Sequence, residues 1–530
     1  MKKELEEACR SWLWLGLALM VFSACRVGSD RARKASPFQF VDVTNECQIV
    51  SHFGSDFYAW ADINQDSFPD VIVTRHRIAP LLFVNQDGRG FRDIFSQTGM
   101  RHDIQEPPET SLYLDKHGCA WGDFNNDGEL ELYIANGAKE GKGIEYNQLY
   151  KPEGKAWLDI AETAGVRDPY GRGRNAAWAD INNDGFLDLF VANAPREAAP
   201  SIFFVNNRDG TFFRCCEFRD INMDGNVYGA WSDFTGDGFM DLTIFSTKNG
   251  GTVSLFENNG RCGFKPRGEF SALAFGWADF NGDGALDLVL TNLAGRSLEE
   301  RRRCPHVLFI NDAHGGFQRK IEINSEAALG FGLAIGDFDN DGAPDLYVQN
   351  GERNQLFRNK GRLQFQNFGR LVSEEDSWRA AAGNRASSID FDNDGDLDLF
   401  IANSEEKGYS PNQAPEKLHN SLGLFRNESR SNNWLKIRLI GTRSNREGIG
   451  AKIILRTRHG PQFREANHGP SGYAQDVLPV HFGLGGASQA DEIEIRWPSG
   501  VRQGLKNVPA RQTCIIKEPA VNVLNPAHRE

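Results

Sequence analysis

The chain has 530 residues, a formal net charge of −13 and 25% charged residues. This length supports a large core without disulfide staples, and the ordinary charged fraction excludes a disordered or fibrous chain. The acidic charge argues against nucleic-acid binding by the whole molecule. Beyond the N-terminus, no apolar run is long enough to predict a polytopic membrane protein. The 55 Gly and 37 Phe residues predict many tight turns between short, aromatic-rich strands.

Residues 1–25 resemble an export signal. The apolar run from Trp12 to Ala24 is too short to span a bilayer but has the length of a signal-peptide core. It ends in Phe22-Ser23-Ala24-Cys25, which resembles the lipobox of bacterial lipoproteins, whose cysteine is acylated after cleavage. Two interpretations stay open, a lipidated Cys25 and an ordinary signal peptide with an incidental cysteine. Under both we expect export, as a bacterial-type cell-envelope lipoprotein or a secreted protein.

Seven further cysteines follow Cys25, and their spacing assigns neither a disulfide nor a metal site. Export permits disulfides, but the cysteines are scattered and odd in number. We therefore interpret them as sporadic. They are Cys47, Cys119, Cys215, Cys216, Cys262, Cys304 and Cys514.

Internal repetition is the strongest signal. The pattern Trp-x-Asp-x-Asn-x-Asp-Gly-x-x-Asp-Leu recurs seven times, with leading aspartates 46 to 61 residues apart, which is the length of a propeller blade. A second motif, Leu-Phe-x-Asn, follows most copies by about 20 residues, as in Leu82–Asn85. Each unit thus offers about four strands. One such unit cannot bury both faces, so a radial arrangement is expected.

These repeats predict an all-β fold with a seven-bladed β-propeller over residues 38–429. The segment Phe38–Val43 precedes the first motif and resembles the strand around Trp157–Ile160. We expect it to supply the outer strand of the last blade and close the ring. A small C-terminal β domain over residues 430–518 and a tail over 519–530 complete the chain.

The Asp-rich loops predict calcium sites. Calcium takes six to eight oxygen ligands, and the loops place carboxylates or amides at positions one, three, five and nine. A glycine at position six lets the backbone reverse. About five to seven bound Ca²⁺ ions are expected. The predicted ligands, loop by loop, are Asp62, Asn64, Asp66, Asp70; Asp123, Asn125, Asp127, Glu131; Asp180, Asn182, Asp184, Asp188; Asp233, Thr235, Asp237, Asp241; Asp279, Asn281, Asp283, Asp287; Asp337, Asp339, Asp341, Asp345; and Asp390, Asp392, Asp394, Asp398.

These loops resemble the calcium loops of FG-GAP/VCBS repeats, found in integrin α-subunit propellers and many bacterial surface proteins. The alternative is that Asn-x-Asp-Gly is plain hairpin-turn chemistry. Repetition of three or more carboxylates per loop favours calcium, since a turn alone needs one. The metal is expected to be structural.

The seven copies are unequal. Ser67 replaces glycine in the first loop, which makes its turn less favourable, and Thr235 is a weak ligand in the fourth. We expect the sixth and seventh loops to bind best, because they add Asp339 and Asp392. Five loops are preceded by tryptophan at a fixed register. This register favours core packing over stacking on carbohydrate.

The segment from Arg430 to Glu518 carries a net charge of +7, which leaves −20 on the rest of the chain, most of it the propeller. Alternating residues in Trp434–Ile440, Ile449–Leu455 and Glu492–Trp497 predict half-buried strands. The basic excess suits an anionic glycan, a phospholipid surface or nucleic acid, or docking against the chain's own acidic propeller.

Motifs in this segment resemble those of the ASPIC/UnbV domain. They are Asn445-Arg446-Glu447-Gly448-Ile449-Gly450-Ala451, Ser471-Gly472-Tyr473-Ala474-Gln475, His481-Phe482-Gly483-Leu484-Gly485 and Trp497-Pro498-Ser499-Gly500. With the repeats, residues 38–518 resemble the cartilage acidic protein 1-like (CRTAC1-like) family. Ala474 departs from the more usual serine before the glutamine. The resemblance indicates kinship rather than a mechanism.

No catalytic constellation stands out in the sequence. There is no His-Glu-x-x-His pair or Gly-x-Ser-x-Gly elbow. A site around His481 is conceivable, although such residues more often satisfy local hydrogen bonds. We therefore expect a monomeric, calcium-stabilised binding, scaffold or adhesion-type protein without catalysis, with a protein or glycan ligand, no nucleic acid, and a membrane anchor if Cys25 is lipidated. The alternative is a secreted carbohydrate-active hydrolase or lyase, which needs a carboxylate pair outside the loops.

Overall fold

The computed structural model describes residues 38–51, 55–75, 78–100, 116–137, 146–194, 200–218, 227–295, 297–317, 319–323, 329–350, 354–361, 363–369, 383–403, 421–429, 432–467, 469, 475–476 and 479–523. The predicted signal segment and Cys25 lie outside them. The chain divides into two compact units, Met1–Gln39 and Phe40–Glu530, and the second is described below. Among the residues described, no helix has the length and apolar character needed to cross a membrane.

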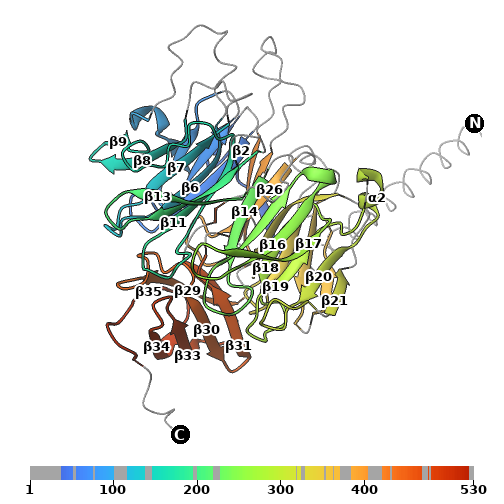
Figure 1. The fold of residues 1–530 in the computed structure, drawn as a ribbon. Coiled ribbons are helices and arrows are strands. Elements are labelled where there is room, and N and C mark those ends of the chain that lie inside the picture. The colour runs from blue at the N-terminus through green and yellow to red at the C-terminus, as the bar shows by residue number, and fades with distance from the viewer. Residues whose placement is uncertain are drawn as a thin grey trace, which may run out of the picture. The chain divides into compact units, whose positions relative to one another are not determined.

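Seven four-stranded antiparallel sheets follow one another through the repeat region (Figure 1). Numbered in chain order, they are β2–β5 (Ser55–Ala61, Asp70–Arg75, Leu81–Asn85, Phe91–Asp93), β6–β9 (Lys116–Gly122, Glu131–Asn136, Gln148–Glu153, Ala156–Asp159), β10–β13 (Gly173–Ala179, Asp188–Asn193, Ser201–Asn206, Phe212–Phe218), β14–β17 (Val227–Ser232, Asp241–Ser246, Thr252–Asn258, Phe264–Phe270), β18–β21 (Phe275–Ala278, Asp287–Leu290, His306–Ile310, Arg319–Ile323), β22–β25 (Gly330–Gly336, Asp345–Asn350, Gln355–Asn359, Phe365–Asn367) and β26–β28 (Gly383–Ile389, Asp398–Asn403, Leu422–Asn427) with β1 (Phe40–Asp42).

The first and last parts of the repeat region share one sheet. Strand β1 pairs with β28 in an antiparallel register that sets Phe40 opposite Asn427 and Asp42 opposite Phe425. It is the outer strand of the seventh sheet, whose order is β1-β28-β27-β26. The predicted closing role of this N-terminal segment is therefore confirmed, and the ends of the ring are tied through backbone hydrogen bonds.

The first strands of successive sheets lie against one another, for example β2 against β6 and β22 against β26. Side chains reinforce these boundaries. Trp121 Nε1 donates to the carbonyl oxygen of Ala59 in the preceding sheet, and Trp178 Nε1 donates to that of Ala120. All five repeat tryptophans are buried, as the core-packing interpretation predicted. The fold is an all-β propeller, as expected from the sequence.

Helical structure is sparse in the described residues. It comprises α2 (Leu298–Arg302) and the 3₁₀ turns η1 (Phe95–Gln97) and η4 (Lys248–Gly250). Helix α2 begins after Ser297, whose hydroxyl accepts the N–H of Glu300, as expected for a helix cap. These elements lie in connections between strands, so the sheets carry the architecture.

The C-terminal domain contains two further sheets around a core of its own. In the first, β29 (Asn433–Ile440) lies between β32 (Val480–Gly485) and the parallel strand β35 (Thr513–Lys517). The second has the order β31-β30-β33-β34, with bounds Gly460–Glu465, Lys452–Thr457, Gln489–Arg496 and Arg502–Pro509.

One predicted strand of this domain begins later than expected. Residues Ile449 to Ala451 precede β30 instead of forming part of it. The amide of Asn445 binds both the N–H and the carbonyl oxygen of Ile449. Gly448 and Gly450 adopt positive φ angles of 69° and 92°. This stretch is therefore a tight turn.

Candidate metal loops and the docked C-terminal domain

Each predicted calcium loop joins the first and second strands of its sheet and is organised by its own aspartates. In loop six, Asp337 Oδ2 accepts the N–H of Gly342, and Asp341 Oδ1 accepts that of Ala343. Asp345 Oδ2 accepts the N–H of Phe338. The same three bonds recur around Asp390, Asp394 and Asp398 in loop seven. Turn chemistry and carboxylate clustering thus occur together in one loop.

Two residues of each loop adopt left-handed backbone conformations. A backbone reversal was predicted at position six, where Gly342 and Gly395 have φ angles of 103° and 92°. Ser67 takes the same role at 76°, a conformation that costs a residue with a side chain more than glycine. Position four was not predicted, although Asn340 there has a φ of 56°. Asparagine tolerates this conformation, and the recurrence of Asn or Gly at position four could have revealed it.

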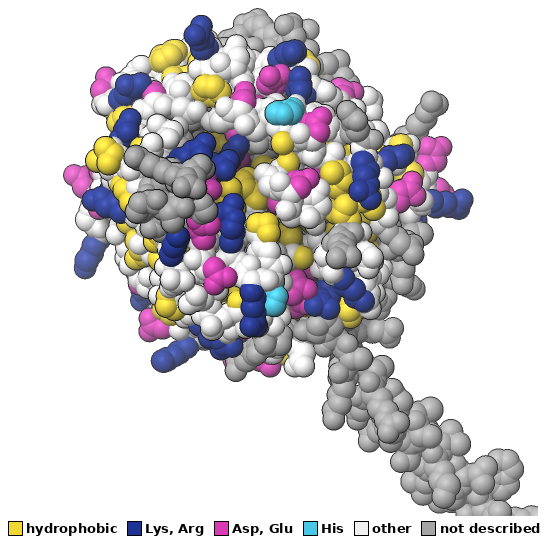
Figure 2. All heavy atoms as spheres, turned by 90° about the horizontal axis from the view of Figure 1, so that it is seen from below, with side chains coloured by type: hydrophobic (Ala, Val, Ile, Leu, Met, Phe, Trp, Pro, Cys, Tyr) yellow, Lys and Arg dark blue, Asp and Glu magenta, His cyan; other side chains and the backbone are white. Residues whose placement is uncertain are grey.

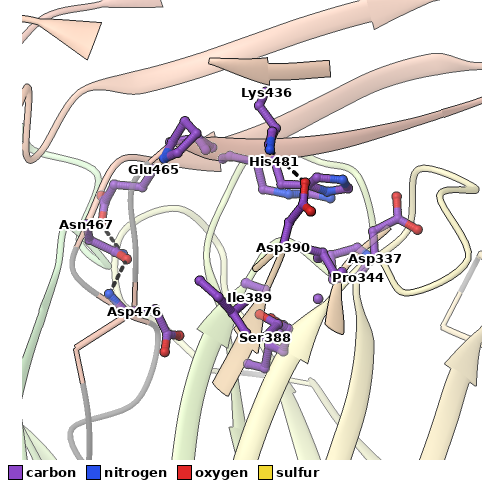
Figure 3. A pocket seen from close by; sticks show the side chains of 18 of the residues that line it. Asp337, Pro344, Ser388, Ile389, Asp390, Lys436, Glu465, Asn467, Asp476 and His481 are labelled. Atoms are coloured by element: carbon purple, nitrogen blue, oxygen red, sulfur yellow. Dashed lines mark hydrogen bonds and ion pairs between the residues drawn. The ribbon is translucent and has the colours of Figure 1, made fainter. Parts of the chain in front are cut away.

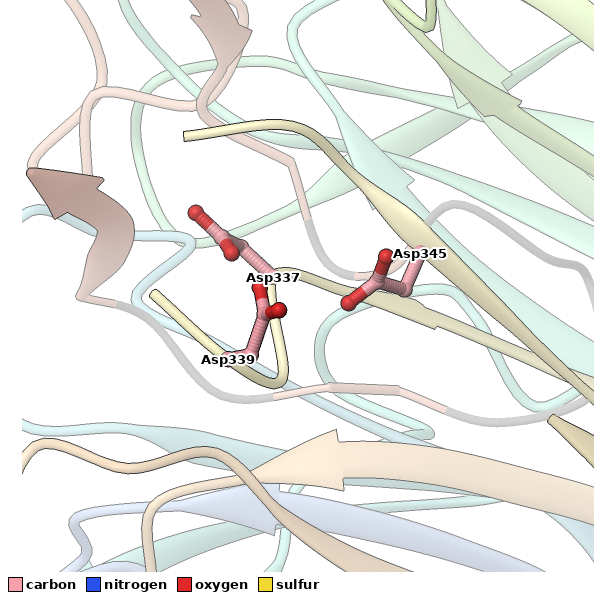
Figure 4. Close-up of side chains that lie close together, drawn as sticks. All are labelled: Asp337, Asp339 and Asp345. Atoms are coloured by element: carbon pink, nitrogen blue, oxygen red, sulfur yellow. The ribbon is translucent and has the colours of Figure 1, made fainter. Parts of the chain in front are cut away.

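Three carboxylates converge in loop six, as Figure 4 shows for Asp337, Asp339 and Asp345. One ligand oxygen from each lies within 4.8 Å of the others. Burial, with the neighbouring aspartates, raises the pKa of Asp339 to about 6. Asp339 Oδ1 is buried and accepts no hydrogen bond in the described structure, while its Oδ2 faces Arg358 Nε at 2.5 Å. A buried, unpartnered carboxylate oxygen is costly, so this site suits a cation.

Loop seven forms a second cluster from Asp390, Asp392 and Asp398. Asp390 Oδ1 is buried and unpartnered, whereas its Oδ2 binds a lysine described below. These two clusters belong to loops six and seven. We expected these loops to bind best because they carry the extra aspartates Asp339 and Asp392. The other five loops have Asn or Thr at position three, so three carboxylates do not meet there in the same way.

Loop two has a glutamate, Glu131, at position nine. Burial raises the pKa of Glu131 to about 9, with Asp127 and Asp123 adding to the effect. The side chain of Asn125 donates to Glu131 Oε1 at 2.8 Å, and Lys151 contacts Asp127 at 2.6 Å. Asp123 Oδ1 and Glu131 Oε2 are buried without hydrogen-bond partners. The loop therefore retains two oxygens for a cation.

Loop four departs from the pattern because its third residue is Thr235. The threonine hydroxyl donates to Asp241 Oδ2 at 2.9 Å. Asp233 forms an ion pair with Lys452 of the C-terminal domain. Each of these contacts engages an oxygen of a predicted calcium ligand.

In six of the seven repeats, the asparagine of the Leu-Phe-x-Asn motif connects its own loop to the preceding repeat. The N–H of Asn258 donates to Asp241 Oδ1, and its side-chain amide donates to the carbonyl oxygens of Met240 and of Ile181 in loop three. The bonds to the preceding sheet recur at Asn85, Asn206, Asn311, Asn359 and Asn427. The sequence shows the motif, but its role as a bridge between sheets was not predicted.

The C-terminal domain docks on the loop face of the propeller through cations. Lys436 Nζ lies 2.6 Å from Asp390 Oδ2, and Arg438 lies 3.1 Å from Asp62 Oδ2. In the view from below in Figure 2, basic and acidic side chains are interspersed on the visible face. The domain thus directs several of its cations to the loops, which favours the docking interpretation of its basic charge.

A cavity of about 330 Å³ lies between the docked domain and the propeller. Figure 3 shows Asp390 and Asp337 from the loops together with Lys436 and His481 from the domain. Burial lowers the pKa of His481 to about 3, so its ring is neutral, and Nε2 contacts the carbonyl oxygen of Gly395 at 3.1 Å. His481 therefore has a docking contact.

Two carboxylates outside the loops also line this cavity. Burial raises the pKa of Glu465 to about 8 and that of Asp476 to about 7. Glu465 Oε2 accepts the N–H of Asp233, and Asp476 hydrogen-bonds Ser387. Both carboxylates are thus engaged with the propeller.

Family models match most of the repeats and the C-terminal domain. The model described as FG-GAP-like repeat matches residues 123–191, 233–290, 279–348 and 337–401, and the model described as ASPIC and UnbV matches 441–523. The chain carries FG-GAP-like repeats and an ASPIC and UnbV domain. This assignment agrees with the resemblance in the sequence.

Curated relatives include cartilage acidic protein 1 from Homo sapiens, which is 26% identical over 71% of this chain and 50% of its own length. The Xenopus tropicalis protein of the same name is 25% identical over 79% of this chain and 56% of its own. These matches are consistent with a CRTAC1-like protein. The chain spans about half the length of the curated relatives it matches.

Solved structures show more distant likeness. An Agrocybe aegerita lectin that recognises non-reducing terminal N-acetylglucosamine has a TM-score of 0.41 and 18% identity, covering 61% of this chain and 83% of the lectin. The V. cholerae biofilm matrix protein Bap1 has a TM-score of 0.38 and 9% identity, covering 80% of this chain and 85% of Bap1.

The motifs of the ASPIC and UnbV domain contact the FG-GAP-like repeats. Gln475 enters between the first strands β2 and β6: its backbone bonds Tyr58 and Trp60, and its side chain bonds both backbone groups of Trp121. The N–H of Arg446 donates to Asn126 in loop two. These motif residues thus act as docking elements, a role that the sequence alone did not supply. Residues 471–474 of the same motif lie outside the described structure.

Proposed function

We propose that this chain is an exported, calcium-stabilised scaffold or binding protein in which calcium holds the loop face that receives the ASPIC and UnbV domain. The observation that carries the proposal is the convergence of Asp337, Asp339 and Asp345 with buried, unpartnered oxygen at Asp339. Calcium prefers such hard oxygen ligands. A bound cation would offset the mutual repulsion of the carboxylates. The likeness to cartilage acidic protein 1 supports a role without catalysis.

Thermal unfolding of the purified protein with calcium and with a chelator tests this proposal. A ligand that binds only the native state stabilises it, by about 2.7 kcal/mol per site at one hundred times its Kd. We expect a higher melting temperature with calcium and about five to seven bound ions per chain, from the number of loops. No change in melting temperature together with no bound metal would show that the loops are plain turns.

A substitution in loop six tests whether calcium acts at that loop. Asp339→Asn removes one of its converging carboxylates, and we expect fewer bound ions and a smaller calcium-dependent shift. Asp209→Asn is a matched control, because Asp209 is exposed, lies outside the loops and hydrogen-bonds only locally to Thr211. Equal responses of the two variants would contradict a site in loop six.

The proposed export rests on the N-terminal sequence, which leaves two forms of the mature protein open, one attached to the envelope and one secreted. Processing at Cys25 would leave an acylated cysteine at the mature N-terminus, whereas an ordinary signal peptide would leave none. Mass spectrometry of the mature N-terminus from the membrane and culture fractions distinguishes these two forms. An uncleaved chain in the soluble cell fraction would contradict export.

The carbohydrate-active alternative has one observation in its favour, namely that Glu465 and Asp476 line one cavity and have raised pKa values. A raised pKa is typical of a general acid, but both groups already contact the propeller. Release of reducing sugar from a panel of polysaccharides tests this alternative. Activity that disappears in both Glu465→Gln and Asp476→Asn, with folding retained, would replace the scaffold proposal.

A further inference from the structure

Two cysteines from neighbouring sheets meet at the boundary between the third and fourth sheets. Cys215 lies on β13, and Cys262 lies in the turn between β16 and β17. Their thiols hydrogen-bond each other, and both side chains are partly buried. Both also pack against the same apolar cluster. The spacing of the cysteines in the sequence did not reveal this pair, because the two belong to different repeats.

Local backbone irregularities place both residues at this boundary. Strand β13 has a bulge at Cys215, because Cys216 pairs with Phe203 while Arg214 pairs with Phe204. A bulge redirects the side chain of its extra residue. Cys262 has a φ of 58°, and glycine fills the matching left-handed positions of two other hairpins, at Gly210 and Gly315. A cysteine thus stands where glycine is the easier residue.

An aromatic contact holds the two hairpins together beside the cysteines. Phe203 of the third sheet stacks on Phe264 of the fourth, with ring centroids 4.6 Å apart and planes 11° apart. Phe203 pairs with Cys216, the residue next to Cys215, and Phe264 lies two positions after Cys262. The sulfur atoms are therefore presented to each other by packed elements. A disulfide requires them to approach to about 2.05 Å.

We propose that Cys215 and Cys262 form a disulfide that covalently links the third and fourth sheets. One thiolate attacks a disulfide oxidant such as oxidised glutathione, forming a mixed disulfide and releasing one reduced thiol. The second cysteine then attacks the mixed disulfide, closes the bond and releases a second reduced thiol. The two cysteines lose two electrons and two protons, and the oxidant gains both. Formation in the cell rests on the proposed export, because oxidising compartments permit disulfides.

Peptide mapping of the full chain tests this bond. The purified protein is incubated with oxidised glutathione, remaining thiols are alkylated, and linked peptides are identified by mass spectrometry. We expect a Cys215–Cys262 linkage that disappears in Cys215→Ser and in Cys262→Ser. Cys304→Ser is the control, since Cys304 lies after α2 and its thiol contacts the carbonyl oxygen of Glu300. Closure is expected to be slow, because burial raises the pKa of Cys262 to about 12.

A linkage to Cys262 that persists in Cys215→Ser and disappears in Cys216→Ser would overturn the assignment. So would complete alkylation of both cysteines after prolonged oxidation of the folded protein. Reduction of the linked protein is expected to lower Tm by roughly 3–8 °C, and no such change is expected for Cys262→Ser. The two proposals fail separately. If the bond closes in vitro but both cysteines are reduced in protein isolated from its native compartment, the pair is supported and export is contradicted.

Discussion

Lys436 of the C-terminal domain places its ammonium nitrogen 2.6 Å from Asp390 Oδ2 at the start of loop seven. Both side chains are almost fully buried, and Lys436 Nζ also donates to Asn393 at 2.6 Å. The carboxylate therefore has two possible counterions, this lysine on Oδ2 and a metal ion on the unpartnered Oδ1. Domain docking and cation binding meet at one residue.

Lys436→Met is expected to destabilise the calcium-free protein by about 3–5 kcal/mol, because it leaves Asp390 buried without its counterion. Calcium is expected to restore part of this loss, so the calcium-dependent shift in melting temperature becomes larger than in the parent protein. Thermal unfolding with and without chelator measures both effects. Arg496→Met is a control that removes an exposed pair with Glu494, for which a change of at most about 1 kcal/mol is expected. An unchanged calcium shift in Lys436→Met would contradict a shared carboxylate.

Asn258→Ala is expected to cost about 2–3 kcal/mol of unfolding free energy. The substitution removes side-chain bonds to Ile181 and Met240 and leaves their buried carbonyl oxygens with fewer partners. Denaturant unfolding measures the loss. Asn207→Ala is the matched control, because Asn207 is exposed and its side chain bonds only Thr211. Similar losses of unfolding free energy in the two variants would show that the bonds made by Asn258 stabilise the protein no more than an exposed hydrogen bond does.

Much of the propeller could be predicted because its repeat is local. The Asp loop and the Leu-Phe-x-Asn motif recur in order through the repeats, so the succession of four-stranded sheets and the closing strand Phe40–Asp42 follow from one pattern. The contacts between repeats could not be predicted in this way. The bond from Asn427 to the carbonyl oxygen of Phe338 recurs in other repeats, but the motif alone does not show which neighbour the asparagine contacts. The pairing of Cys215 with Cys262 occurs once and carries no periodic signal.

Gln475→Ala is expected to loosen the ASPIC and UnbV domain from the propeller. The side chain of Gln475 accepts the N–H of Trp121 at 2.7 Å and donates to its carbonyl oxygen at 3.0 Å, and all of these groups are buried. Losing both bonds is expected to cost about 2–3 kcal/mol. Limited proteolysis should then cut between the two domains sooner. Gln512→Ala, which removes an exposed bond to Pro509, serves as the control and should leave the rate unchanged. Equal rates for both variants would contradict a docking role for Gln475.

The burial of His306 predicts that the protein loses stability in acid. A single substitution of this histidine should remove its share of the loss. The ring is fully buried, burial lowers its pKa to about 4, and Nδ1 accepts the N–H of Asn292. An unfolded histidine has a pKa near 6.5, so between these two values the unfolded chain binds more protons than the folded one. Stability from this group is complete above about pH 6.5 and falls by up to about 3 kcal/mol as pH decreases to 4. Unfolding free energies across this range should therefore decline less steeply in His306→Gln. His314→Gln, at an exposed position, should follow the parent protein, and parallel curves for all three proteins would contradict a buried neutral His306.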